Sequence, residues 1–162
     1  MSTAQTNLPL PLTSTLAPWQ EVRAPHGLGY RIRLMAQLMS RLFQEKLDPY
    51  GLTPFHWVVL CCLWQQDGQA TSQIGEKLSQ VGGTMTGVID RMEERGLVRR
   101  ERDGRDRRIW RIWLTDMGRQ LEATLPPLAL EVREAAFAGI TEAEQKLISD
   151  AVDRAIANLA HP

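Results

Sequence analysis

Arginine is the residue type whose spacing in this sequence most clearly points to chemistry. Seven arginines lie between residues 99 and 111, against three acidic residues, so this segment carries a formal charge of +4 while the 162-residue chain as a whole is neutral. Guanidinium groups bind phosphates and are attracted into narrow minor grooves of DNA. Because a nucleic acid experiences local rather than total charge, the segment is a candidate DNA contact.

The pattern around these arginines predicts a β-hairpin. Residues 97–102 and 109–114 each have the composition of a strand, and residues 103–108 between them form a charged, turn-forming tip that begins Asp103-Gly104. This geometry would place Arg105, Arg107 and Arg108 at or near the end of the hairpin.

A pair of short helices is predicted just before the hairpin. Thr71 and Ser72 cap the first, at about residues 73–80, Gly82 and Gly83 form a turn, and the second helix runs over about 84–95 and ends at Gly96. In a helix-turn-helix the second helix presents its N-terminal end to the major groove, where small polar side chains contact bases and phosphates. The predicted DNA-binding residues are Thr71, Ser72, Gly82, Gly83, Thr84, Thr86, Arg105, Arg107 and Arg108.

Longer helices are predicted on both sides of this region. A helix with one apolar stripe begins near Leu28 and ends before Pro49, and a second, apolar on nearly every side, begins at Thr53-Pro54. Thr115 caps a long helix with a bend at Pro126-Pro127, and a capping box from residue 141 to residue 144 opens a last amphipathic helix.

The predicted fold class is therefore mainly α with a small β wing. We expect a winged helix-turn-helix over 53–115, with N- and C-terminal dimerisation helices over 28–52 and 116–160. Residues 1–27 would form a flexible arm, with a short extra helix as the alternative. The apolar stripes of the terminal helices exceed what one small domain can cover, which predicts a homodimer and a pseudo-palindromic DNA site.

The segment from residue 52 to residue 121 resembles the MarR family of transcription regulators, most clearly in GTMTGVIDRMEERGLVRR, DGRDRR and LTDMGR. The resemblance extends over roughly residues 28–160. It implies an obligate dimer held by the terminal helices, one recognition helix per half-site, and usually repression. It also implies a salt bridge between Asp90 and Arg108. Gly87-Val88 departs from relatives that carry polar or basic residues there, so Thr84, Thr86 and the wing would contribute more of the binding.

The resemblance further implies a small-molecule signal, since relatives commonly bind phenolic or aromatic carboxylates in a cleft between the dimerisation helices and the winged domain. The candidate ligand-binding residues are His26, Tyr30, Arg33, His56 and Trp57. The alternative interpretation is that His56 caps a helix or packs in the core, and that Trp57 is a core residue. Ligand would change the spacing of the two recognition helices and release a repressor from DNA.

Two other functions remain open on the sequence. A winged-helix module that binds protein rather than DNA is one, and the arginine-rich tip argues against it. A cysteine redox sensor is the other. Cys61 and Cys62 lie in an apolar run, whereas redox-sensing relatives carry their cysteine in the first helix.

Several further classes are not indicated. The three histidines share no metal-ligand spacing with one another or with the cysteines, so no metal or cofactor is predicted. A nucleophile–base pair and a glycine-rich phosphate loop are also missing, so we expect no enzyme. The N-terminus lacks the pattern of a signal peptide and no run of residues could span a membrane, which predicts a soluble, cytoplasmic protein.

Overall fold

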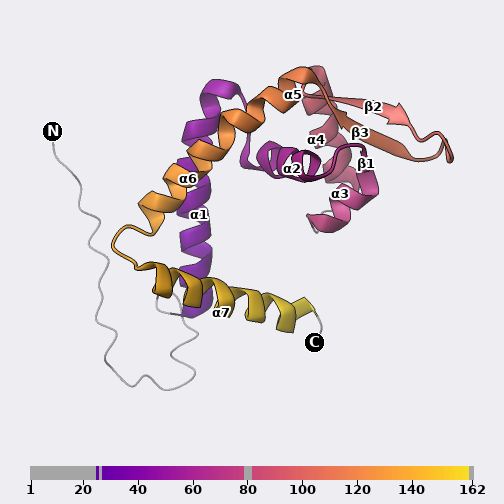
Figure 1. Cartoon of the computed structure of the whole chain (residues 1–162). Coiled ribbons are helices and arrows are strands. Elements are labelled where there is room, and N and C mark those ends of the chain that lie inside the picture. The colour runs from indigo at the N-terminus through magenta and orange to yellow at the C-terminus, as the bar shows by residue number, and fades with distance from the viewer. Residues whose placement is uncertain (1–24, 26, 79–81, 161–162) are drawn as a thin grey trace. The chain divides into compact units, whose positions relative to one another are not determined.

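The computed structural model describes residue 25, residues 27–78 and residues 82–160. Within these ranges the chain forms seven α-helices, two short 3-10 helices and three strands (Figure 1). The helices are α1 (Leu28–Leu47), α2 (Pro54–Gln65), α3 (Thr71–Lys77), α4 (Gly82–Glu94), α5 (Asp116–Gln120), α6 (Leu125–Ala136) and α7 (Glu142–Ala160), with 3-10 turns η1 (Asp48–Tyr50) and η2 (Leu121–Ala123). The predicted fold class, mainly α with a small β wing, is confirmed, while the predicted arm at 1–27 lies almost entirely outside the described residues.

Helix α2 begins where the sequence predicts and lies at the centre of the winged domain. The Thr53 Oγ1 accepts a hydrogen bond from the His56 backbone N–H, and Pro54 takes the first helical position, where its missing N–H is not needed. Its buried side chains join a core with α3, α4, the sheet and α6. The fully buried large side chains of this core are Leu47, Leu52, Val59, Leu60, Leu63, Ile74, Met85, Ile89, Met92, Ile112 and Leu125.

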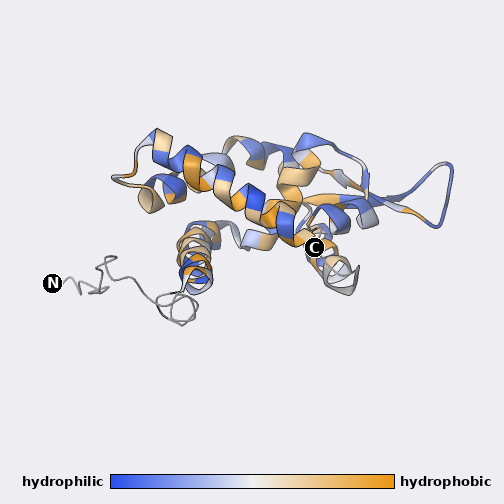
Figure 2. Ribbon diagram, turned by 90° about the horizontal axis from the view of Figure 1, so that it is seen from below, coloured by the Kyte–Doolittle hydropathy of each residue, from blue (hydrophilic) through white to orange (hydrophobic). Residues whose placement is uncertain are grey.

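The sheet has three antiparallel strands, β1 (Gln69–Ala70), β2 (Val98–Arg102) and β3 (Trp110–Leu114), in the order β1-β3-β2. Strands β2 and β3 form the predicted hairpin, which extends beyond α3 and α4 (Figure 1). The loop between these two strands is mostly hydrophilic (Figure 2). Strand β1 was not predicted, because two residues are too few to show an alternating pattern.

Three boundaries differ from the sequence prediction. Thr71 is the first residue of α3 and not its cap, since Ala70 occupies the N-cap position and its N–H donates to the Gln73 side chain. Gly82 and Gly83 belong to the first turn of α4. The single bent helix predicted after Thr115 is α5, η2 and α6, with the two prolines in the first turn of α6, where proline fits best.

The chain divides into two compact units, residues 1–38 and residues 39–162. In the first unit, the apolar side chains of α1 are largely exposed: Leu28, Ile32, Met35 and Leu38. In the second unit, α7 has no buried residue, although hydrophobic residues recur along it among hydrophilic ones (Figure 2). Among the described helices, none is long and apolar enough to cross a lipid bilayer.

Candidate nucleic-acid interface

Helix α4 has one face in the core and the opposite face open to solvent. Met85, Ile89 and Met92, spaced three and four residues apart, are fully buried, whereas Thr86 is exposed. Gly82, Gly83 and Thr84 form the first turn of the helix. The predicted contact residues of this helix therefore lie at its N-terminal end, which is the end that a helix-turn-helix presents to a groove.

Helix α3 brings the other two predicted residues of the helix pair to its own first turn. Ser72 is exposed and Thr71 is half-buried. The Thr71 hydroxyl lies 3.4 Å from the backbone carbonyl oxygen of Trp110 and donates to it. This contact ties the start of α3 to the hairpin, so the two predicted parts of the interface are connected directly.

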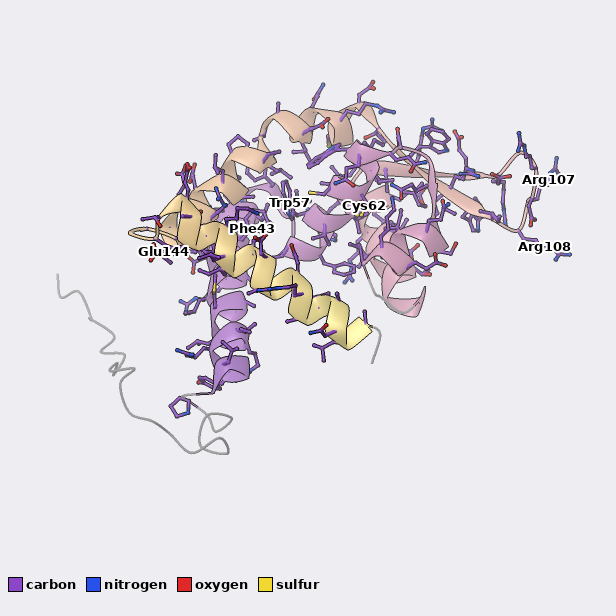
Figure 3. All side chains as sticks on the ribbon, turned by 60° about the horizontal axis from the view of Figure 1, so that its bottom comes forward. Phe43, Trp57, Cys62, Arg107, Arg108 and Glu144 are labelled. Carbon is purple, nitrogen blue, oxygen red and sulfur yellow. The ribbon has the colours of Figure 1, made fainter. Side chains whose placement is uncertain are left out.

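Asp90 pairs with Arg100. The family resemblance had implied Arg108 as its partner, and that prediction is wrong. The Arg100 Nη2 lies 2.5 Å from Asp90 Oδ1 and 3.2 Å from the Thr86 carbonyl oxygen, and its Nη1 lies 3.7 Å from a Glu93 carboxylate oxygen. Strand β2 follows α4 after a tight turn at Gly96, so Arg100 lies alongside the helix. Arg108 lies at the far end of the hairpin (Figure 3).

The wing loop is organised by Asp103, for which the sequence predicted only a position in a turn. Its Oδ1 accepts hydrogen bonds from the backbone N–H groups of Asp106 (2.9 Å) and Arg105 (2.8 Å), and its Oδ2 pairs with Arg111. These interactions, led by the two backbone N–H groups, lower the pKa of the Asp103 carboxyl to about 2. The Arg111 Nη1 also donates to the Gly68 carbonyl oxygen (2.9 Å), so the loop is held to the turn that follows α2.

The seven arginines of this region fall into two groups. Four make contacts within the chain: Arg99 pairs with Glu101, Arg100 with α4, Arg111 with the wing loop, and the Arg102 guanidinium lies 3.8 Å from the centroid of the Trp110 ring. The other three form no ion pair with any residue that the structure describes, and they are exposed to solvent. They are Arg105, Arg107 and Arg108, the three predicted to contact DNA, and Arg107 and Arg108 point away from the strands (Figure 3).

The five candidate ligand residues fall in different parts of the chain. His26 lies outside the described residues. Tyr30 and Arg33 belong to the unit of residues 1–38, where the Arg33 guanidinium lies 5.3 Å from the Tyr30 ring centroid. His56 and Trp57 lie on α2.

His56 has a structural role at the start of α2. It is buried, and its Nδ1 accepts a hydrogen bond from the Thr53 backbone N–H (3.1 Å), which completes a capping box. Burial, and then the positive charges of Arg95 and Arg91, lower the pKa of the imidazole. A neutral, hydrogen-bonded imidazole fits the capping interpretation of His56 rather than ligand binding.

Trp57 lines a small pocket. Its ring makes edge-to-face contacts with Phe43 and Trp64, each with 5.5 Å between centroids (Figure 3). The pocket has a volume of about 230 Å³ and lies between α2 and the η2–α6 segment. Its lining residues are Trp57, Cys61, Trp64, Gln65, Glu122 and Pro126.

The two cysteines are in an environment that suppresses the reactive thiolate. Burial, together with the neighbouring Cys62, raises the pKa of the Cys61 thiol to about 11, and burial also raises the pKa of Cys62. At neutral pH both are thiols, whereas a redox sensor requires an accessible thiolate. Among the described residues, no group of three or more His, Cys, Asp or Glu side chains could hold a metal ion.

Comparison with known proteins identifies transcription regulators as relatives of this chain. The sequence model of the MarR family matches residues 52–110. The chain is 32% identical over 123 residues to the HTH-type transcriptional regulator TtmR of Methylorubrum extorquens, which covers 76% of this chain and 62% of TtmR. It is also 32% identical over 104 residues to the organic hydroperoxide resistance transcriptional regulator of Bacillus subtilis, covering 64% of this chain and 71% of that protein. The chain thus spans less than two thirds of the length of TtmR.

A solved structure shows the same fold. It is that of BpsR from Bordetella bronchiseptica, whose DNA binding is regulated by 6-hydroxynicotinic acid. The TM-score is 0.72 at 28% sequence identity, covering 78% of this chain and 96% of BpsR. Both curated relatives named above are transcription regulators rather than enzymes.

Proposed function

The chain belongs to the MarR family, and on that premise we propose that it is a sequence-specific DNA-binding transcription regulator that acts in the cytoplasm. The observation that carries the proposal is the arrangement of the winged domain. The exposed face of α4 and a hairpin tip with three uncommitted arginines belong to one packed unit. In such a unit α4 enters the major groove, and the wing arginines reach the adjacent minor groove.

We propose that the protein binds as a homodimer. Helix α7 carries apolar side chains that the chain itself leaves exposed, with Leu147 68%, Ile156 59% and Leu159 81% exposed. Burying such side chains in an interface stabilises the complex by roughly 25 cal/mol per Å² of apolar surface removed from water. A two-fold partner would cover the same face on both copies and would place two α4 helices on a pseudo-palindromic operator.

We further propose that the protein is a repressor that a small phenolic ligand releases from DNA. The pocket between α2 and the η2–α6 segment has aromatic walls, and Glu122 is its charged lining residue. A neutral phenol fits such a lining better than an aromatic carboxylate, because its hydroxyl can donate to Glu122 while a carboxylate would be repelled. BpsR, whose DNA binding is regulated by 6-hydroxynicotinic acid, supports a small aromatic signal in general, although that acid carries the carboxylate that the Glu122 lining disfavours.

The test is fluorescence anisotropy of the full chain on the duplex upstream of its own gene and on an unrelated duplex. We expect the upstream duplex to bind at least about a thousandfold more tightly, and Arg107→Ala to weaken binding. Arg41→Ala removes the same charge from an exposed i,i+4 pair on α1 and serves as the matched control. Sedimentation of the free protein measures whether it is a dimer.

Two outcomes would contradict the proposal. If the wild-type protein binds neither duplex at low salt, the winged domain contacts a protein and not DNA. If peroxide releases the DNA from the wild-type protein but not from Cys61→Ser, the signal is oxidation of a thiol. We expect neither, because the tip arginines are free for phosphates and the raised pKa of Cys61 keeps its thiol protonated.

A further inference from the structure

The β2–β3 hairpin has an inner face that continues from the core out toward the DNA-binding elements. Cross-strand partners on this face are Val98 with Leu114, then Arg100 with Ile112, then Arg102 with Trp110. Val98, Leu114 and Ile112 are buried in the core, and Arg100 pairs with α4. Side chains alternate along a strand, so the Arg102–Trp110 pair lies on this same face, one step further out.

Trp110 is exposed although it shares a face with the core. Trp110 is 40% exposed, whereas Ile112 and Leu114 on the same face of β3 are buried. The Trp110 indole N–H is bonded to none of the described residues. An exposed indole at this place therefore has both an apolar ring and an unused hydrogen-bond donor.

Arg102 holds the indole in position. Its guanidinium stacks on the Trp110 ring at 3.8 Å from the centroid, and its Nη1 donates to the Arg107 carbonyl oxygen at 2.7 Å. The Trp110 backbone carbonyl accepts the hydroxyl of Thr71 at the start of α3. The backbone of Trp110 is thus tied to the start of α3, and its ring is tied through Arg102 to the loop that carries Arg105, Arg107 and Arg108.

This position matters for how a duplex would lie on the protein. If α4 occupies a major groove and the wing tip the adjacent minor groove, the sugar–phosphate strand that separates the two grooves must pass between them. The inner face of the wing borders this passage, and Trp110 is its outermost aromatic residue. The positive charge of Arg102 and of the tip arginines favours a phosphate beside the indole.

We propose that Trp110 is a DNA-backbone contact: its indole N–H donates to a phosphate oxygen of the strand that crosses between the two grooves, and its ring packs against the adjoining deoxyribose. The proposal rests on the proposed DNA-binding function. It adds a neutral contact to an interface otherwise dominated by arginine, and Arg102 acts as the positioning residue for this contact.

The test compares Trp110→Phe with Trp110→Ala and with Trp113→Phe as the matched control. Phenylalanine keeps an aromatic ring under Arg102 but lacks the N–H. Trp113 lies on the opposite face of the hairpin, and its Nε1 is buried without a partner among the described residues. Affinities for the upstream and unrelated duplexes are measured by anisotropy at several salt concentrations, with urea unfolding as a check on the fold.

We expect Trp110→Phe to weaken binding about tenfold in a dimer, which loses two hydrogen bonds, and Trp110→Ala to weaken it further. The loss should be equal on both duplexes because phosphates carry no sequence information. The salt dependence should not change because no charge is removed. Trp113→Phe should bind like the wild type.

Three results would overturn the proposal. If Trp110→Phe binds like the wild type, the indole N–H makes no contact. If the salt dependence falls together with the affinity, the substitution has instead displaced the tip arginines. If the wild-type protein binds neither duplex, the DNA-binding function fails, and this contact fails with it. The first two results leave the DNA-binding function intact, so the two failures are distinguishable.

Discussion

Removal of one wing-tip arginine should change the salt dependence of DNA binding by an amount that the structure sets. Each phosphate neutralised contributes about 0.9 to the slope of log affinity against log salt. In a dimer with three free arginines per protomer, the two wings together would therefore contribute about 5 to this slope. Arg107→Ala removes two contacts from the dimer and should lower the slope by about 1.8.

The difference is large enough to measure. Over a fourfold rise in salt, the wild type should lose about 12-fold more affinity than Arg107→Ala, as follows from the difference in slope. The assay is an anisotropy titration at four or more salt concentrations, repeated for Arg105→Ala and Arg108→Ala. Arg99→Ala is the matched control, because its guanidinium is paired with Glu101.

The Arg99→Ala control distinguishes contacts of individual arginines with DNA from an effect of the total charge of the wing. If Arg99→Ala lowers the slope as much as Arg107→Ala does, DNA responds to the total charge of the wing and not to individual free side chains. The division of the arginines into engaged and free groups would then have no functional meaning. An unchanged slope in all three tip variants would mean that the tip does not contact DNA.

Three further predictions concern stability and are measured by urea unfolding. Gly68→Ala should lower the unfolding free energy by about 1–3 kcal/mol, because Gly68 has a φ of +70° and an added Cβ would overlap the Trp113 ring. Thr115→Ala should cost about 1 kcal/mol, since its Oγ1 accepts from the Gly118 N–H at the start of α5. Stability should fall as the pH drops below about 6.5, because the unfolded chain binds a proton at His56 more readily than the folded chain, and His56→Gln should remove this part of the dependence.

Each of these predictions has a specific contrary result. Gly104→Ala is the control for Gly68→Ala, because an added Cβ there would meet nothing within 4 Å. Equal stability of the two variants would show that the Trp113 ring moves aside at no cost. A Thr115→Ala variant as stable as the wild type would mean that water replaces the cap. A pH dependence that persists in His56→Gln would have to come from another group.

Local signals in the sequence were sufficient for most of the helices. Thr53, Thr115 and Thr141 each cap the helix that follows, as predicted, because a cap involves only residues within one turn. Gly96 ends α4 with a φ of +70°, also as predicted. The hairpin could be predicted for the same reason, since its Asp-Gly tip separates two short segments of strand composition.

Contacts between residues far apart in the chain could not be predicted from the sequence. Nothing local distinguishes Arg100 from Arg108 as the partner of Asp90, because the choice depends on which arginine the tight turn at Gly96 places beside α4. The pairing of Asp103 with Arg111 likewise depends on strand register. The exposure of Trp110 depends on where the covering helices end, which an alternating pattern does not show.

The candidate ligand site shows the same limit. The family resemblance suggested one cleft with residues of α1 and α2, yet His56 has a capping role and Trp57 contacts Trp64 beside a pocket that Glu122 also lines. The aspartate–glycine pair at the wing tip was a usable signal for Asp103, since an aspartate before glycine often accepts hydrogen bonds from the next backbone N–H groups.

The internal pairing of four of the seven wing arginines has a consequence for how the protein searches for its site. With a net charge of zero, the protein has little attraction for DNA at long range. Its positive field lies at the hairpin and fades within about 8 Å at physiological ionic strength. The residues outside 99–111 carry a formal charge of −4, so they repel a duplex that approaches another side of the molecule, and only encounters that begin at the wing persist. The pairing thereby limits unproductive collisions and orients those that remain.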